Sequence, residues 1–186
     1  MTRIQISLAG LMAVVLLLAA YQPSQSDPPK QDQKVQARAP EPLRIEHTHL
    51  HRQLENAIQS GGKTGEAAKT VARRMAPHFE KEEQIATPPL GLLSSLSQGT
   101  ATKEEMRQIL PLTERLKEEL PEMLKEHEQI VLALKELSKA AKAEDKAEVA
   151  EFAEKLILHA RTEEQVLYPA AILVGEHIKL KLKMEE

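Results

Sequence analysis

The sequence predicts an all-helical domain, a four-helix bundle built from two antiparallel hairpins, behind a hydrophobic export segment and a disordered linker. Only 2% of the 186 residues are aromatic and none is tryptophan, so the core must consist of aliphatic side chains, which suit helix packing better than sheets. Apolar residues recur at helical spacing along the first two expected helices. The domain also repeats one helix–loop–helix plan twice, which is typical of an internal duplication.

The first 42 residues are expected to precede the bundle. A basic start, MTR, leads into an apolar run over residues 4–20, which is the pattern of an export signal. A run of about 17 apolar residues also reaches the lower limit for a membrane-spanning helix. Residues 1–21 are therefore a signal peptide or an N-terminal membrane anchor, and residues 22–42, rich in Gln, Pro and Ser, are a disordered linker. We expect an exported protein, periplasmic or membrane-anchored and facing outside the cytoplasm.

The domain is expected over residues 43–170. Helical spacing predicts a first helix over 43–60, which Gly61 and Gly62 stop. A second helix follows over 64–86, kinked or weakened at Pro77 and ended by the Pro88–Pro89 pair. Its inward residues are expected to be Val71, Met75, Phe79, Glu82 and Ile85.

The second hairpin follows a loop expected over 91–101. Thr102 and Glu105 form the capping-box pattern that opens a helix, and Pro111 and Pro121 divide this region into helices over 103–119 and 121–142. A last bundle helix begins near Asp145, as a cap, and reaches Tyr168 before Pro169. Residues 171–186 form a helical tail.

Charge and cysteine content exclude several classes of function. The formal net charge is −3, so the chain lacks the basic character of a nucleic-acid-binding protein, and no nucleic-acid partner is expected. The absence of cysteine excludes disulfides, thiolate metal sites and cysteine nucleophiles. Any metal in this protein must be held by nitrogen and oxygen atoms.

Two stretches repeat a metal-ligand pattern. HFEKEEQIATP, from His78, and HARTEEQVLYP, from His159, both read His-x-x-x-Glu-Glu-Gln, then apolar residues, then proline. Residues four apart lie on one helix face, so His78 with Glu82, and His159 with Glu163, can each direct a nitrogen and a carboxylate at one centre. A single such pair is common and means little.

Two single histidines recur in register with these pairs. Glu46-His47 precedes the first pair and Glu126-His127 the second, and 31 residues separate His47 from His78 while 32 separate His127 from His159. A lone histidine is usually a surface residue, but a purely structural bundle gives no reason for four histidines to repeat across two halves. The repeat therefore predicts four histidines and two glutamates in one interior.

Imidazole and carboxylate without thiolate suit iron, manganese or zinc, and six ligands exceed what one tetrahedral zinc needs, so two metal ions are implied. Four terminal histidines and two bridging glutamates would suit a dinuclear iron centre with room for a small diatomic ligand. The ferritin-like arrangement needs two Glu-x-x-His motifs, and only Glu46-x-x-His49 fits.

IEHTHLHRQL, HFEKEEQ, KEHEQIVLAL and HARTEEQVLYP, taken as an ordered set, resemble the hemerythrin family in its HHE cation-binding branch, over about residues 43–170. The resemblance implies an up-down four-helix bundle and a non-haem di-iron centre that contains two iron ions. The family's ligands correspond to six positions, namely His47, His78, Glu82, His127, His159 and Glu163.

The chain departs from the oxygen-carrying hemerythrins at two positions. Those proteins have a further histidine where this chain has Val131, and an aspartate ligand where it has Glu164. Reversible oxygen transport is therefore a weaker expectation than di-iron binding. His51 is expected to be exposed rather than a spare ligand, and Tyr168 to pack in the core rather than donate a hydrogen bond near the metals.

We accordingly expect a metal-binding protein more than an enzyme. Its partner is expected to be a small diatomic or peroxide ligand, such as oxygen or nitric oxide, which it binds, senses or detoxifies. The alternatives are an iron-handling protein and a redox enzyme that uses the same di-iron centre. A tether to the membrane through residues 4–20 is compatible with each of these functions.

Overall fold

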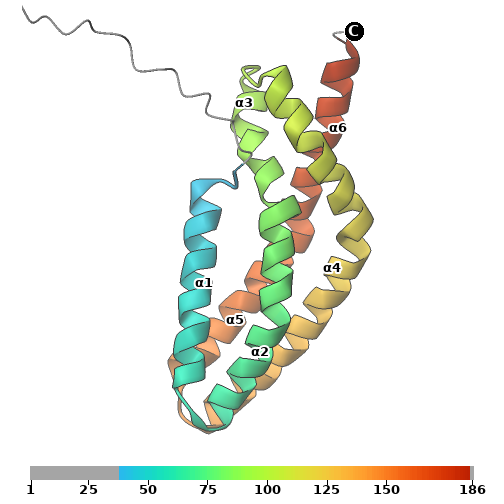
Figure 1. Ribbon diagram of the computed structural model, residues 1–186. Helices are drawn as coiled ribbons and strands as arrows, with labels where there is room; N and C mark the ends of the chain where they lie inside the picture. Colours follow the sequence, from blue (N-terminus) through green and yellow to red (C-terminus); the bar gives the residue numbers. More distant parts are fainter. Residues whose placement is uncertain (1–37, 185–186) are drawn as a thin grey trace, which may run out of the picture. The chain divides into compact units, whose positions relative to one another are not determined.

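A computed structural model describes residues 38–184, and within this range every element is a helix and none is a strand (Figure 1). The expected all-helical bundle is confirmed. The expected export segment lies outside the described residues, as does most of the expected linker. Within the described range, no helix has both the length and the apolar character needed to cross a membrane.

Four long helices form the bundle: α1 (Glu41–Gln59), α2 (Gly62–Lys81), α4 (Lys103–Ala143) and α5 (Ala147–Thr162). Successive helices of this set run in opposite directions, and the tight connections α1–α2 and α4–α5 meet at one end (Figure 1). The inward residues expected on the second helix, from Val71 to Ile85, are all buried. The duplicated hairpins thus pack face to face.

The connection between the hairpins is more helical than expected. A π-helical turn, Glu82–Ala86, continues α2. A 3₁₀ helix, Pro88–Leu92, extends into the expected loop over 91–101, which also contains a short helix α3, Leu93–Ser97. The loop prediction was therefore wrong for residues 91–97. Pro88 and Pro89 suit the start of the 3₁₀ helix because a proline needs no N–H partner in a first turn.

The division of the third region at its prolines was also wrong. Helix α4 is one element of 41 residues that contains both Pro111 and Pro121, and it bends along its length in Figure 1. The φ angle of proline is compatible with a helix, so each proline removes one hydrogen bond and bends the helix without ending it. Burial of Leu116 and Met123 along this stretch offsets the loss. The capping box of Thr102 and Glu105 is confirmed.

The last helical region also continues through its proline. A π-helical turn, Glu163–Leu167, joins α5 directly to α6, Tyr168–Met184, which contains Pro169. The expected cap at Asp145 was wrong, since the N-cap of α5 is Lys146 and Asp145 adopts a left-handed φ of 56° in the turn. The tail is thus a full helix that packs against α4.

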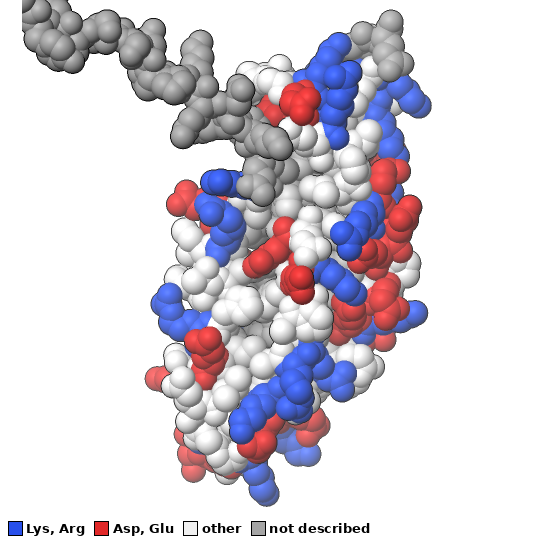
Figure 2. Space-filling model, in the orientation of Figure 1, with Lys and Arg blue, Asp and Glu red and all other residues white. Residues whose placement is uncertain are grey.

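The apolar core lies in clusters on either side of one polar layer. The cluster toward the hairpin turns includes Leu54, Phe79, Leu134 and Leu156, and the next one includes Ile85, Met123 and Tyr168. Between them lie buried histidines and glutamates. On the face seen in Figure 2, acidic and basic side chains are interspersed rather than gathered by sign.

Glu144 joins the two hairpin turns at the end of the bundle. Its carboxylate accepts hydrogen bonds from the backbone N–H groups of Lys63 and Thr64, from the Thr64 hydroxyl and from Lys146. The first two donors belong to the first turn of α2, so Glu144 caps a helix of the other hairpin. These bonds, that from Lys146 above all, lower the pKa of Glu144 from 4.5 to about 2.

Replacing Glu144 with glutamine should lower the melting temperature by a few degrees at neutral pH, because a neutral amide binds these donors less strongly. The folded-state pKa lies below the unfolded value, so the stabilisation is complete above about pH 4.5 and disappears as the pH falls toward 2. Thermal unfolding of both proteins from pH 7 to pH 2 should show the difference shrinking in that window. Glu148→Gln, at an exposed position on α5, is the control. An unchanged difference at pH 2 would contradict the assignment.

Candidate metal centre

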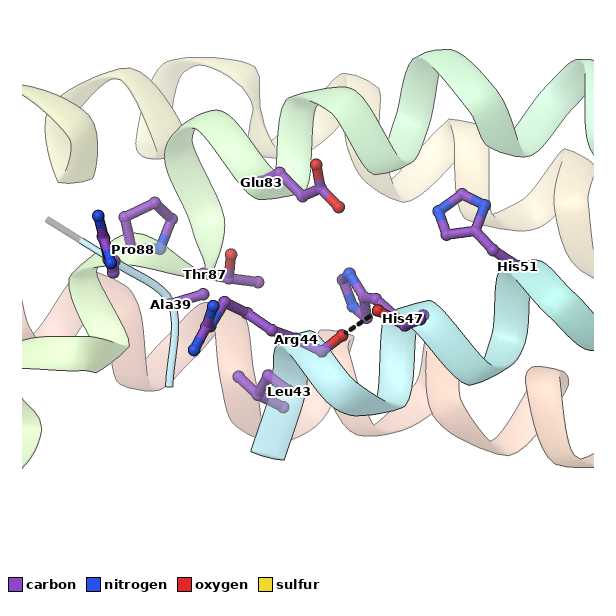
Figure 3. A pocket seen from close by; sticks show the side chains of 10 residues that line it. Ala39, Leu43, Arg44, His47, His51, Glu83, Thr87 and Pro88 are labelled. Carbon is purple, nitrogen blue, oxygen red and sulfur yellow. Dashed lines mark hydrogen bonds between the residues drawn. The ribbon is translucent and has the colours of Figure 1, made fainter. Parts of the chain in front are cut away.

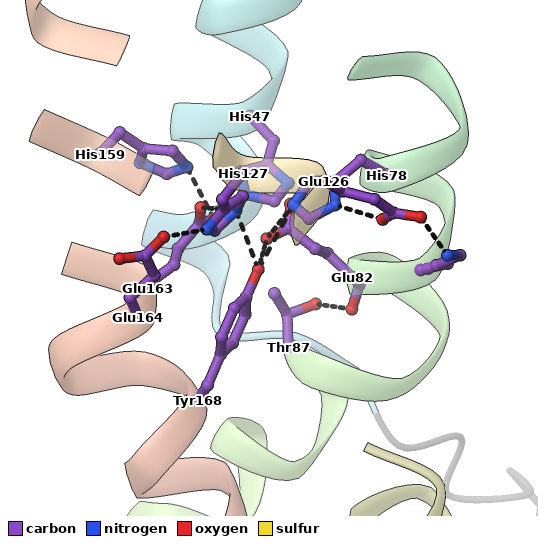
Figure 4. Close-up of polar contacts among 11 residues, drawn as sticks. His47, His78, Glu82, Thr87, Glu126, His127, His159, Glu163, Glu164 and Tyr168 are labelled. Atoms are coloured by element: carbon purple, nitrogen blue, oxygen red, sulfur yellow. Dashed lines mark hydrogen bonds and ion pairs between the residues drawn. The ribbon is translucent and has the colours of Figure 1, made fainter. Parts of the chain in front are cut away.

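The structure brings all six candidate ligands into the polar layer of the bundle, as two adjacent groups (Figure 4). The first, called the His47 group, contains His47, His159 and Glu163. The second, called the His78 group, contains His78, Glu82 and His127. Within each group three ligand atoms lie within 4.8 Å of one another. Each group combines the His-x-x-x-Glu pair of one hairpin with the single histidine of the other hairpin.

Both glutamates of the pairs begin a π-helical turn. The Thr87 N–H donates to the Glu82 carbonyl at 2.9 Å, and the Tyr168 N–H donates to the Glu163 carbonyl in the same way. A proline follows each donor, and in a regular helix its ring would clash with the carbonyl four residues earlier. The wider turn relieves this clash, so the proline at the end of each motif has a structural role at the site.

Glu163 contacts both groups. Its Oε1 lies 2.8 Å from His159 Nε2 and 3.7 Å from His47 Nε2, while its Oε2 lies 3.5 Å from His127 Nε2. Glu82 contacts one group, with Oε1 3.5 Å from His78 Nε2. The two carboxylate oxygens of Glu163 thus face different groups, which is the geometry of a bridging carboxylate.

Three carboxylates outside the six candidates hold the far nitrogens of the histidines. His78 Nδ1 lies 2.9 Å from Glu126, His159 Nδ1 lies 3.1 Å from Glu46, and His127 Nδ1 lies 3.0 Å from Glu164. A carboxylate acceptor keeps a proton on Nδ1 and leaves the Nε2 lone pair directed inward. Carboxylates hold metal-ligating histidines in this tautomer.

The atoms that face the centre lack partners within the protein. Four buried side-chain atoms in the described residues have no hydrogen bond, and all belong to candidate ligands: His47 Nε2, Glu82 Oε2, His159 Nε2 and Glu163 Oε1. His159 Nε2 and Glu163 Oε1 are close but not aligned for a hydrogen bond. Buried polar atoms are costly without a partner, so a set of nitrogen and carboxylate atoms directed at one centre fits a metal ion.

The pKa values of Glu163 and His159 are shifted in opposite directions. Burial would raise the pKa of Glu163, but its contacts with His127, His159 and His47 outweigh burial and hold it well below its usual value. Burial lowers the pKa of His159, yet attraction to Glu163 prevails and raises it to about 9. A proton on His159 therefore supplies positive charge that a metal ion would replace.

The pKa of Glu82, the second carboxylate, is shifted in the opposite direction. Burial, followed by repulsion from Glu163, raises the pKa of Glu82, although His78 and Tyr168 act against this. The pKa of His78 is raised in turn, because the hydrogen bond and attraction to Glu82 outweigh burial. Two carboxylates this close cannot both ionise without added positive charge.

A family model for the hemerythrin HHE cation-binding domain matches residues 39–171. The chain belongs to this hemerythrin family. No curated protein and no solved structure matches it significantly. Membership in the family and the two His/Glu groups together make this hemerythrin domain a metal-binding domain.

Sequence reasoning missed several residues of the hemerythrin site. The carboxylates Glu46 and Glu126 each precede a motif histidine, and Glu164 follows a motif glutamate, so their constant place beside the repeated ligands was the available signal.

Tyr168 packs in the core as expected, but its hydroxyl also donates to Glu82 Oε1. His51 is exposed as expected, and its ring lies 4.5 Å from that of Phe79.

Proposed function

We propose that this hemerythrin domain holds two iron ions, one in the His47 group and one in the His78 group, with Glu163 between them. The arrangement of unpartnered Nε2 and carboxylate atoms, with Nδ1 atoms held by outer carboxylates, carries the proposal. Iron bound there would supply redox chemistry and a place for a small diatomic or peroxide ligand, such as oxygen or nitric oxide. The protein's own residues would position the metals.

Iron handling, in which metal is loaded and released, and redox turnover at the same centre are the alternative functions. The six candidate ligands are at most 8% exposed, which favours a resident metal over one that is exchanged readily. Outer carboxylates hold three of the four imidazoles in fixed orientations, which also favours a preformed site. Binding, sensing or detoxifying a small ligand is therefore the function we favour.

Metal analysis of the purified protein should give about two irons per chain, with ligand-to-metal charge-transfer bands in the visible spectrum. Removing the metal should lower the melting temperature, since a ligand that binds only the folded state stabilises it. A folded protein that remains colourless and metal-free after anaerobic reconstitution with iron(II) would contradict the proposal.

Mixing the reduced, iron-loaded protein with oxygen then separates the functions. A spectrum that returns when oxygen is removed indicates reversible binding, whereas continuous consumption of oxygen or peroxide with a reductant indicates an enzyme. Release of iron on reduction would favour the iron-handling alternative.

A further inference from the structure

Thr87 and Tyr168 occupy equivalent positions in the two halves of the duplication but have different side chains. Each lies five residues after the motif glutamate, precedes a proline, and donates its N–H to that glutamate's carbonyl. The backbones are therefore equivalent, while the side chains differ greatly in length. Tyr168 affects the His78 group, whereas Thr87 affects the His47 group.

Tyr168 closes the His78 group. Its side chain is buried, at 2% exposed, and its hydroxyl donates to Glu82 Oε1 and lies 3.4 Å from His78 Nε2 and 3.3 Å from His127 Nε2 (Figure 4). One oxygen thus contacts all three residues of the group. Only Glu82 Oε2 remains without a partner there, among the described residues.

Thr87 leaves the His47 group open. Its hydroxyl donates to the Glu82 carbonyl at 3.2 Å instead of reaching toward a ligand. Beside it lies a pocket of about 410 Å³, which His47 and Glu83 also line (Figure 3). The remaining three unpartnered atoms, His47 Nε2, His159 Nε2 and Glu163 Oε1, all belong to this group.

The outer carboxylates show the same difference. Glu83 is the counterpart of Glu164, which binds His127 Nδ1. In the described part of the chain no hydrogen bond joins Glu83 to His47, and Glu83 lines the pocket instead. A second pocket, of about 570 Å³, reaches His159 from another side, and neither pocket is lined by a residue of the His78 group. Both of these pockets thus lead to the His47 group.

We propose that the two metal positions are unequal: Tyr168 is an additional protein donor of the His78 position, whereas the His47 position accepts an external small ligand through the pocket beside Thr87. This inference rests on the proposed function. Coordination by the Tyr168 oxygen would replace its hydrogen bond to Glu82 and release one proton to solvent. Arg38 and Arg44 line the same pocket, so a small anion is the class of ligand it favours.

The spectrum of the iron(III)-loaded protein tests the tyrosine. The unaltered protein should show a tyrosinate-to-iron charge-transfer band and phenolate vibrations in resonance Raman spectra. Tyr168→Phe should lose both signals while it keeps iron in the His47 group. The chain has two tyrosines, so Tyr21→Phe is the matched control and should keep both signals. Iron-loaded protein without a tyrosinate signal, or an unchanged signal in Tyr168→Phe, would overturn the assignment.

Azide binding to the iron(III)-loaded protein tests the pocket. Thr87→Tyr places at position 87 the side chain that closes the other group, so azide association should slow several-fold while the iron content stays unchanged and the Tyr168 tyrosinate signal is retained. Thr87→Val, which keeps the size of the side chain, should bind azide at the original rate. Thr48→Trp at the exposed pocket lining gives a second obstruction if Thr87→Tyr fails to fold.

Unchanged azide rates in the obstructed variants would overturn the assignment of the entrance. That failure is distinct from failure of the proposed function, because the latter appears as an unaltered protein that binds no iron at all. Azide binding that displaces or shifts the tyrosinate signal would place azide at the His78 group, and this result would also overturn the inference.

Discussion

Glu163→Ala protein is expected to retain less than about a tenth of the iron that the unaltered protein binds, since loss of an outer partner alone costs about 10–100-fold in metal affinity. Glu163 contacts both groups, so its removal weakens both metal positions. Glu82→Ala should be less severe, because Glu82 contacts histidines of one group only. Iron per chain after identical reconstitution, measured by elemental analysis, gives the comparison.

His51→Ala is the matched control for these variants. It removes a histidine one turn after His47, but the ring is exposed and packs on Phe79, so iron content should stay nearly unchanged. Circular dichroism should show that all variants remain helical. Loss of iron in His51→Ala, or full retention in Glu163→Ala, would show that the ligand set is wrong.

Glu126→Ala is expected to weaken iron binding by about 10–100-fold, the usual cost of losing the carboxylate that holds a metal-ligating histidine. Glu126 accepts the Nδ1–H of His78 and also pairs with Lys81, so it fixes both the tautomer and the orientation of the ring. Glu46→Ala should behave similarly through His159. Competition with a coloured iron chelator measures the loss of affinity.

Two further carboxylates separate this effect from a general loss of negative charge. Glu122, one turn before Glu126 on α4, pairs with the exposed Lys125, so Glu122→Ala should keep the original affinity. Glu83→Ala should also have little effect, because Glu83 holds no histidine despite its place in the repeat. Equal losses in Glu83→Ala and Glu126→Ala would contradict the role of the Nδ1 hydrogen bond.

Much of the fold and the candidate site could be predicted because the signals are local. Apolar spacing placed the first helix within two residues of its observed bounds, and the Thr102–Glu105 capping box needs only neighbouring residues. The gathering of four histidines and two glutamates in one interior followed from a repeat of near-constant length, whereas the structure decided that His47 groups with His159 and His78 with His127. Export through residues 4–20 stays a prediction.

The sequence by itself determined the bundle, its family and the six residues gathered in its interior, because helical periodicity and a duplicated motif can be recognised from residue spacing alone. Only the tertiary structure decided that α4 runs through Pro111 and Pro121, because packing along the whole helix offsets two lost hydrogen bonds. It alone also decided the partners of the outer carboxylates and the difference between Thr87 and Tyr168. These contacts depend on the distance between side chains on different helices, and residue spacing in the sequence does not give that distance.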